Sequence, residues 1–112
     1  MREFNYKGHP IFAISKKQAI DYIKEGKQEE CDLKKLLDYL YPTDVMFEYQ
    51  STSKDGKYIK VILYNDLWLD IYPWSKYQYR VVKHDNNAKT KITEFYWSHK
   101  ELLHYLNTNY EG

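Results

Sequence analysis

Five segments between residues 45 and 97 alternate in side-chain character at every second residue, and this pattern constrains the fold more than any other feature. They are VMFEYQS (45–51), YIKVILY (58–64), LWLDIY (67–72), YQYRVVK (77–83) and KITEFYW (91–97). All are rich in the β-branched and aromatic residues that favour strands. Turn residues separate them, at Asp55-Gly56, Asn65-Asp66, Pro73 to Ser75 and Asn86-Asn87. Such short links make neighbouring strands antiparallel, so the pattern predicts a five-stranded antiparallel meander.

The residues before this run predict a hairpin and a helix. FNYKGHPIFAI alternates around Lys7-Gly8 and is typical of a short hairpin. Ser15 then opens SKKQ, a capping box in which the hydroxyl accepts a hydrogen bond from a backbone N–H of the first helical turn. We expect this helix to run to about Glu25 and to end at Gly26 in the left-handed conformation.

Two more helices are expected, one before the meander in the sequence and one after it. The first begins near Glu29, ends before Pro42, and carries an apolar stripe at i, i+3, i+4 and i+7: Leu33, Leu36, Leu37 and Leu40. The second begins at SHKE, a capping box with Ser98 as N-cap and Glu101 at the third helical position. Its buried stripe is formed by Leu102, Leu103 and Leu106. The prediction is therefore an α+β fold: a five-stranded antiparallel meander with three helices and a short N-terminal hairpin.

Composition and length predict one domain over residues 1–112, in a reducing compartment. A chain of 112 residues can bury a core without a disulfide or a metal. Its one cysteine, Cys31, forbids an internal disulfide, which fits the cytosol. No stretch has the pattern of a secretory signal or the length of an apolar membrane span. We expect a cytoplasmic protein that does not contact a membrane.

The charge balance excludes two classes of partner-binding protein. The formal net charge is +1, from 17 basic and 16 acidic residues. A dedicated binder of duplex DNA is usually more basic, and a DNA mimic is strongly acidic. Lysine outnumbers arginine 15 to 2, and there are 13 Tyr but only 3 Ala. This bias follows AT-rich codons and indicates a low-GC bacterium or its phage as the source.

The stretch NDLWLDIYPWSKYQYR (65–80) is the most informative for function, because five of its sixteen residues are aromatic. Alternation places Leu67, Leu69 and Ile71 on one face of the sheet and Trp68, Asp70 and Tyr72 on the other. The strand before it divides in the same way into an aliphatic and a mixed aromatic and charged face. The two aliphatic rows share a face only if the turn at Asn65 includes a bulge, because a slip of one residue exchanges the faces.

The helices should cover the aliphatic face, which leaves two alternatives for the aromatic face. It is either a second core layer under the hairpin or a helix, or a surface that contacts a partner. We favour burial for Trp68 and Tyr72. We favour exposure for Trp74, Tyr77 and Tyr79, because polar residues interleave with them. The candidate partner-binding residues are Trp68, Tyr72, Trp74, Lys76, Tyr77, Tyr79 and Arg80.

Patterns that indicate catalysis or a metal are missing from the sequence. His99 and His104 are five apart, so they do not share one helical face as a zinc pair does. Cys31 lies between Glu30 and Asp32, and neighbouring carboxylates disfavour the thiolate that a nucleophile needs. With four glycines in the chain, a phosphate-binding loop is not expected. We predict no catalytic, metal or cofactor site.

Two functions fit these observations, and a third is kept as a minor alternative. The first is a non-catalytic protein of a phage or mobile element that binds and inhibits a host protein such as a defence nuclease (an anti-defence role). This is an analogy from size and composition. The second is binding of single-stranded nucleic acid, with bases stacked on the aromatic face and lysines along the backbone. A hydrolase or nuclease remains the third, and an exposed strand edge leaves a homodimer possible.

Overall fold

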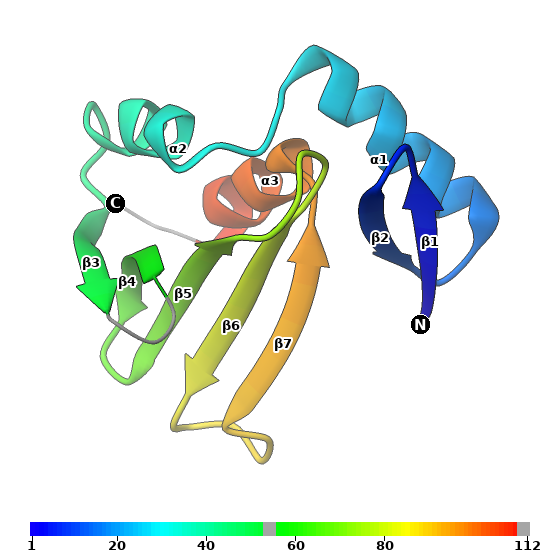
Figure 1. Cartoon of the computed structure of the whole chain (residues 1–112). Helices are drawn as coiled ribbons and strands as arrows, with labels where there is room; N and C mark the ends of the chain where they lie inside the picture. The colour runs from blue at the N-terminus through cyan, green and yellow to red at the C-terminus, as the bar shows by residue number, and fades with distance from the viewer. Residues whose placement is uncertain (53–55, 110–112) are drawn as a thin grey trace.

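The computed structural model describes residues 1–52 and 56–109, and its secondary structure follows the predicted order (Figure 1). The elements are β1 (Arg2–Tyr6), β2 (His9–Ala13), α1 (Lys16–Gln28), α2 (Leu33–Leu40), β3 (Met46–Thr52), β4 (Gly56–Tyr64), β5 (Leu67–Pro73), β6 (Tyr79–Asp85), β7 (Ile92–Trp97) and α3 (His99–Asn109). The predicted α+β class, the hairpin and the meander are all confirmed. Part of the predicted Asp55-Gly56 turn lies outside the described residues.

Strands β3 to β7 form one antiparallel sheet in the order of the sequence, and β1 and β2 form a separate hairpin. The register settles the question of the faces. Ile59 pairs with Ile71 and Val61 with Leu69, so the aliphatic rows of β4 and β5 share one face. The register shifts between Ile62 and Tyr64, which is the bulge that this arrangement requires.

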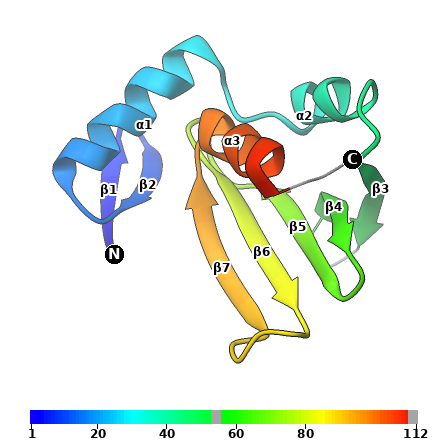
Figure 2. The same cartoon turned by 180° about the vertical axis from the view of Figure 1, so that it is seen from behind.

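Helices α2 and α3 cover the aliphatic face (Figures 1 and 2). In Figure 2, α3 lies in front of the sheet, and in Figure 1 it lies behind it. The core between these layers joins leucines of both helices to the sheet, and its fully buried members include Leu36, Leu40, Ile59, Val61, Leu69, Ile71, Val81 and Leu102. The apolar faces of α2 and α3 thus pack against the aliphatic face of the sheet, which gives a two-layer α+β fold.

The hairpin and α1 form a second, smaller cluster beside β7 (Figure 1). Ala19, Tyr22 and Gly26 are the buried residues of α1, and they pack with Ile11 of β2 and with Tyr77. A β-carbon on Gly26 would lie 2.1 Å from Cδ1 of Tyr77, so only glycine lets the helix approach the ring this closely.

One buried glutamine joins the hairpin to the main sheet. The Gln78 side chain accepts a hydrogen bond from the Phe12 N–H (2.9 Å) and donates one to the Phe12 carbonyl (2.8 Å). It also donates to the Tyr96 carbonyl of β7 at 3.4 Å. Its amide therefore satisfies the outer edge of β2 in the way that a neighbouring strand would.

Two predicted helix limits are wrong. Gly26 does not end α1, which continues to Gln28, because this glycine serves close packing rather than a left-handed turn. The second helix does not begin near Glu29 but at Leu33, where the Asp32 side chain accepts from the Lys34 N–H at 2.9 Å and caps it.

The predicted capping box of α3 forms in full, but in α1 only the serine half forms, because the Gln18 side chain accepts from the Ile14 N–H (2.8 Å) and not from the Ser15 N–H. In α1, the Ser15 hydroxyl accepts from the Gln18 N–H at 3.2 Å. In α3, the Ser98 hydroxyl accepts from the Glu101 N–H at 3.2 Å, and the Glu101 carboxylate accepts from the Ser98 N–H at 3.2 Å. These local signals start each helix where the sequence predicts.

Candidate functional site: the open face of the sheet

No described helix covers the face of the sheet opposite α2 and α3 (Figure 1). The hairpin reaches only the end of this face at β7 (Figure 1). We call this face the open face. Strand pairing arranges its side chains in three rows across the strands. The first row is Gln50, Tyr58, Tyr72, Arg80 and Tyr96; the second is Glu48, Lys60, Asp70, Val82 and Glu94; the third is Met46, Ile62, Trp68, His84 and Ile92.

In the first row, the side chains pack against one another along the sheet. The rings of Tyr58 and Tyr72 stack with centroids 4.8 Å apart. The Arg80 guanidinium lies over the Tyr72 ring, 5.2 Å from its centre, and forms an ion pair with Glu94 at 3.2 Å. The hydrogen bond to Glu94 raises the pKa of Arg80, and the hydrogen bonds from the Tyr96 hydroxyl and from Arg80 lower the pKa of Glu94. This row therefore holds its charges in place.

In the third row, Trp68 packs against one side chain from each of its two neighbouring strands. The His84 ring stacks on it at 4.7 Å with an angle of 7° between the planes. The Lys60 ammonium lies 5.0 Å from the centre of a Trp68 ring. The row ends in two apolar side chains at the sheet edges, Met46 and Ile92, which are 66% and 62% exposed. It is an apolar band with its aromatic centre half-buried and its two ends in solvent.

Asp70, between these rows, is the most unusual charged group of the open face. Its Oδ2 lies 2.9 Å from Nε2 of His84. Its other oxygen, Oδ1, is buried and has no hydrogen-bond partner among the described residues. Burial raises the pKa of Asp70, and the neighbouring His84 opposes that shift. Because this oxygen is closed off from solvent, a partner cannot reach it unless the side chains around it move.

The structure brings only part of the predicted binding set together. Trp68, Tyr72 and Arg80 lie on the open face, and all three are half-buried. Trp74 lies at its hairpin end, where its ring stacks on Phe12 at 5.0 Å. Lys76 lies apart from the face and pairs with Glu30 at 3.3 Å. Burial of Trp68 and Tyr72 as a full second core layer was the favoured expectation, and it is only partly met.

The expectation that Tyr77 and Tyr79 are exposed is wrong. Tyr77 is 3% exposed and contacts the hairpin, and Tyr79 is 0% exposed in the main core. Tyr79 shares its strand parity with Val81, which faces the helices, so alternation puts both in the core. The polar neighbours suggested a wet strand, but Gln78 is itself buried by the hairpin. No local sequence signal indicates that role of Gln78.

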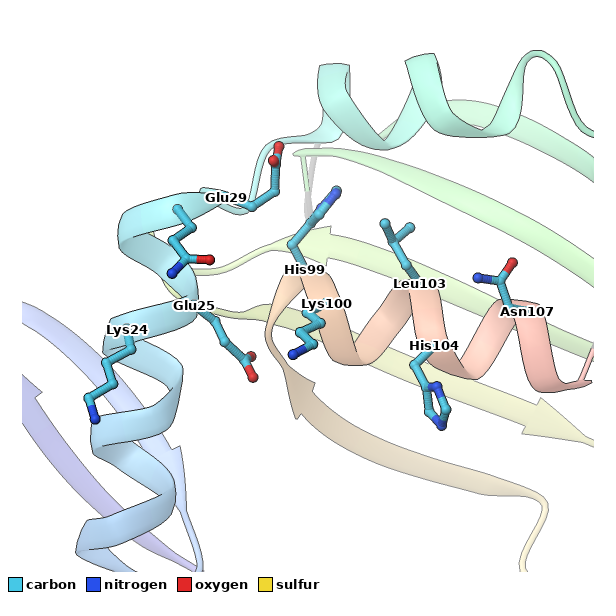
Figure 3. A pocket seen from close by; sticks show the side chains of 9 residues that line it. Lys24, Glu25, Glu29, His99, Lys100, Leu103, His104 and Asn107 are labelled. Atoms are coloured by element: carbon cyan, nitrogen blue, oxygen red, sulfur yellow. The ribbon is translucent and has the colours of Figure 1, made fainter.

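A cavity of about 600 Å³ lies between α1 and α3, and most of the residues that line it are polar or charged (Figure 3). His99 and His104 both line it, but their rings point in opposite directions from α3 (Figure 3). Glu25 accepts a hydrogen bond from the Ser98 hydroxyl, so that serine is engaged in the joint between the helices. These side chains do not assemble a nucleophile with a base.

Behind this cavity, three reactive side-chain types are held in unreactive states. The Tyr79 hydroxyl lies 2.8 Å from Nδ1 of His99 and also bonds both backbone groups of Asp32 at 3.0 Å. Burial lowers the pKa of His99 and raises the pKa of Tyr79. Burial also raises the pKa of Cys31 to about 12, aided by Glu101 and Glu25. The carboxylates that oppose the thiolate come from α1 and α3 and are not the sequence neighbours of Cys31.

Comparisons with known proteins and a search for common site types add no assignment. Family models, curated proteins and solved structures give no significant match to the chain. Within residues 1–52 and 56–109, no group of three or more His, Cys, Asp or Glu side chains is arranged to hold a metal ion. In the same part of the chain, no helix is long and apolar enough to cross a membrane.

Proposed function

We propose that this chain is a non-catalytic binding protein that docks on another protein through the open face. The observation that carries the proposal is the uncovered sheet face, with half-buried Trp68, Tyr72 and Arg80 at its centre. Trp, Tyr and Arg are the residue types most enriched at binding hot spots. The exposed side chains of Met46 and Ile92 at the two sheet edges add apolar contacts for the same partner.

The packing of the rings favours a protein partner over single-stranded nucleic acid. Bases bind to sheets by stacking on ring faces that point to solvent. On the open face, the Tyr72 ring lies between Tyr58 and Arg80, and the Trp68 ring lies between His84 and Lys60. Neighbouring side chains already pack on these rings, which leaves less ring surface for stacking with bases. The charges are also balanced, since Arg80 is paired with Glu94 and His84 lies beside Asp70.

The biological role we infer for this binding is inhibition of a host protein by a phage or mobile element in the cytoplasm of a low-GC bacterium. The codon bias of the composition supports the source, and the small size supports a blocking rather than an enzymatic role. A host defence nuclease is the target class that we would test first. We do not infer a hydrolase or nuclease activity of the chain itself, because His99, His104 and Cys31 do not form a reactive arrangement.

The test is affinity capture from a low-GC bacterial lysate with three baits: the wild type, Trp68→Ala and Tyr41→Ala. Tyr41 is 70% exposed and is the C-cap residue of α2, so its variant controls for loss of an exposed aromatic away from the open face. We expect one dominant protein with the wild type and with Tyr41→Ala, and its loss with Trp68→Ala. Truncation of a hot-spot residue costs about 2 kcal/mol or more, which is roughly thirtyfold in affinity.

Nuclease treatment and thermal unfolding decide what a negative result means. If the captured material disappears after nuclease treatment or with a modest rise in salt, the nucleic-acid alternative replaces the proposal. If Trp68→Ala loses fold and binding together, Trp68 is a core residue and not a contact residue. A protein captured equally by all three baits does not bind through the open face.

A further inference from the structure

A second surface, independent of the open face, lies between the N-terminal hairpin and α1. It is a groove of about 390 Å³ with an apolar floor formed by Phe4, Ile11, Ala19 and Ile23. Volumes of this size are typical of binding sites. The groove exists because α1 packs on the hairpin through the helix face that carries Ala19. The strands do not cover the adjacent apolar side chains of α1, which include the 42% exposed Ile20.

The rim of the groove carries positive charge only. Lys16, Lys24 and Lys27 line it, and no acidic residue is among its lining side chains. Among the described residues, none of these three lysines forms an ion pair. Lys27 and Lys7 lie 5.6 Å and 5.4 Å from the centre of the Tyr6 ring. Hydrogen bonding with Lys27, followed by the charges of both lysines, lowers the pKa of that tyrosine. An apolar floor with a cationic rim selects a ligand that is both apolar and acidic.

The lysines are spread along the groove, which selects an acidic chain over a single acidic head group. Lys16 and Lys27 are at opposite ends of α1, about 16 Å apart at 1.5 Å per residue. The five residues of β1 span about 14 Å alongside. A fatty acid has one carboxylate and can reach one end, whereas a peptide with acids at both ends can reach both. The floor of Phe4, Ile11 and Ile23 gives a phosphate backbone no polar partner.

The outer edge of β1 supplies main-chain groups at this groove. The two-residue turn makes Tyr6 and His9 a hydrogen-bonded pair, so the N–H and C=O groups of Asn5 and Glu3 point away from β2. By the same alternation, the backbone groups of Pro10 and Phe12 face the outer edge of β2. Pro10 has no N–H, and the Phe12 groups are already bound by Gln78. In both views β1 lies on the side of the hairpin away from β7 (Figures 1 and 2). Among the described residues, β1 pairs only with β2.

We propose that an extended, acidic and apolar segment of a partner protein binds here by adding a strand to the outer edge of β1. Its apolar side chains fill the groove over Phe4 and Ile23, and its carboxylates at either end meet Lys16 and Lys27. Its main chain exchanges hydrogen bonds with Glu3 and Asn5. Strand addition of this kind takes affinity from the main chain and specificity from alternate side chains.

The test is fluorescence anisotropy with a labelled seven-residue peptide that carries Leu and Val at positions 3 and 5 and Glu at positions 1 and 7, which all share one strand face. We expect saturable binding that Lys16→Glu/Lys27→Glu weakens about tenfold or more, because two ion pairs become repulsions. The matched control Lys89→Glu/Lys91→Glu makes the same change in net charge in the exposed β6–β7 connection and should leave affinity unchanged. A peptide with Lys in place of Glu should not bind.

A second pair of variants tests the main-chain contact. Glu3→Pro and Glu3→Gln both remove the same negative charge, but only proline removes the outward N–H, and neither removes a bond of the hairpin. We expect Glu3→Pro to bind the peptide several-fold more weakly than Glu3→Gln, with both folded by circular dichroism. The proposal is overturned by no saturation at about 1 mM peptide, by equal binding of Glu3→Pro and Glu3→Gln, or by stronger competition from decanoate or oligo-dT than from unlabelled peptide.

Discussion

Replacing Gly26 with alanine is the change for which the structure gives the sharpest expected effect. The new β-carbon would lie 2.1 Å from Cδ1, 3.0 Å from Cε1 and 3.1 Å from Cγ of Tyr77, where carbon atoms normally lie about 3.5–4.0 Å apart. The ring has little room to move, because it contacts Tyr6 and His9 edge to face at 5.9 and 5.4 Å. Overpacking of this kind costs about 3 kcal/mol at the upper end of its usual range. Alanine regains about 1 kcal/mol of helix propensity, so we expect a net loss of roughly 2 kcal/mol in the free energy of unfolding.

The sign of this effect should reverse when the ring is removed. In the background of Tyr77→Ala, only the gain in helix propensity remains, so Gly26→Ala should stabilise the protein by about 1 kcal/mol. Tyr77→Ala alone should cost about 3–5 kcal/mol, as expected for a buried aromatic residue. Equilibrium urea denaturation of the four proteins, followed by circular dichroism, gives the coupling energy directly. Equal destabilisation by Gly26→Ala in both backgrounds would refute the reasoning, because the cost would then not arise from the ring.

Three further predictions concern the joint and the buried polar groups. Gln78→Ala leaves the Phe12 N–H and carbonyl unpaired, so it should cost about 1–3 kcal/mol and speed hydrogen exchange at the Phe12 amide more than at amides of β5. Burial lowers the pKa of His99, so the unfolded chain binds its proton more readily, and the free energy of unfolding should fall as the pH drops below about 6.5. His99→Asn should lose less stability than the wild type between pH 7 and pH 5, and a parallel loss in both proteins would contradict the role of His99. Cys31 should react with iodoacetamide at pH 8 about a thousandfold more slowly in the folded than in the urea-unfolded protein, because a pKa of about 12 leaves little thiolate; comparable rates would show that the thiol is not buried as described.

The predicted elements that are correct depend on local chemistry. Period-2 alternation and turn residues define the strands, and Ser15 and Ser98 start their helices with the capping bonds that the sequence predicts. The errors arise where a distant contact overrides a local signal. Gly26 looks like a helix stop in the sequence but serves the packing of Tyr77, which lies 51 positions further along the chain. Glu29 looks like a helix start, but Asp32 is the cap.

The candidate site shows the same division. Trp68, Tyr72 and Arg80 were predicted from composition and alternation. Strand register groups them with Tyr58 and Lys60, which alternation placed on the mixed face of the preceding strand, and with His84, which the sequence did not indicate. Tyr77 and Tyr79 were assigned to the same surface because their neighbours are polar. Alternation alone could have placed Tyr79 with Val81, but the burial of Tyr77 and Gln78 depends on where the hairpin docks.

The sequence by itself determined the order of helices and strands, the antiparallel meander and the aliphatic core face, because periodicity, capping and short turns act between residues close in the chain. Only the tertiary structure decided which aromatic residues stay at the surface. The bulge at Leu63 sets the register of β4 and β5, and the docking of the hairpin through Gln78 and Gly26 covers one end of the sheet. Both features depend on contacts between residues of different strands and helices. The register of a strand pair and the need for glycine at a close contact become apparent only when the strands and helices pack together.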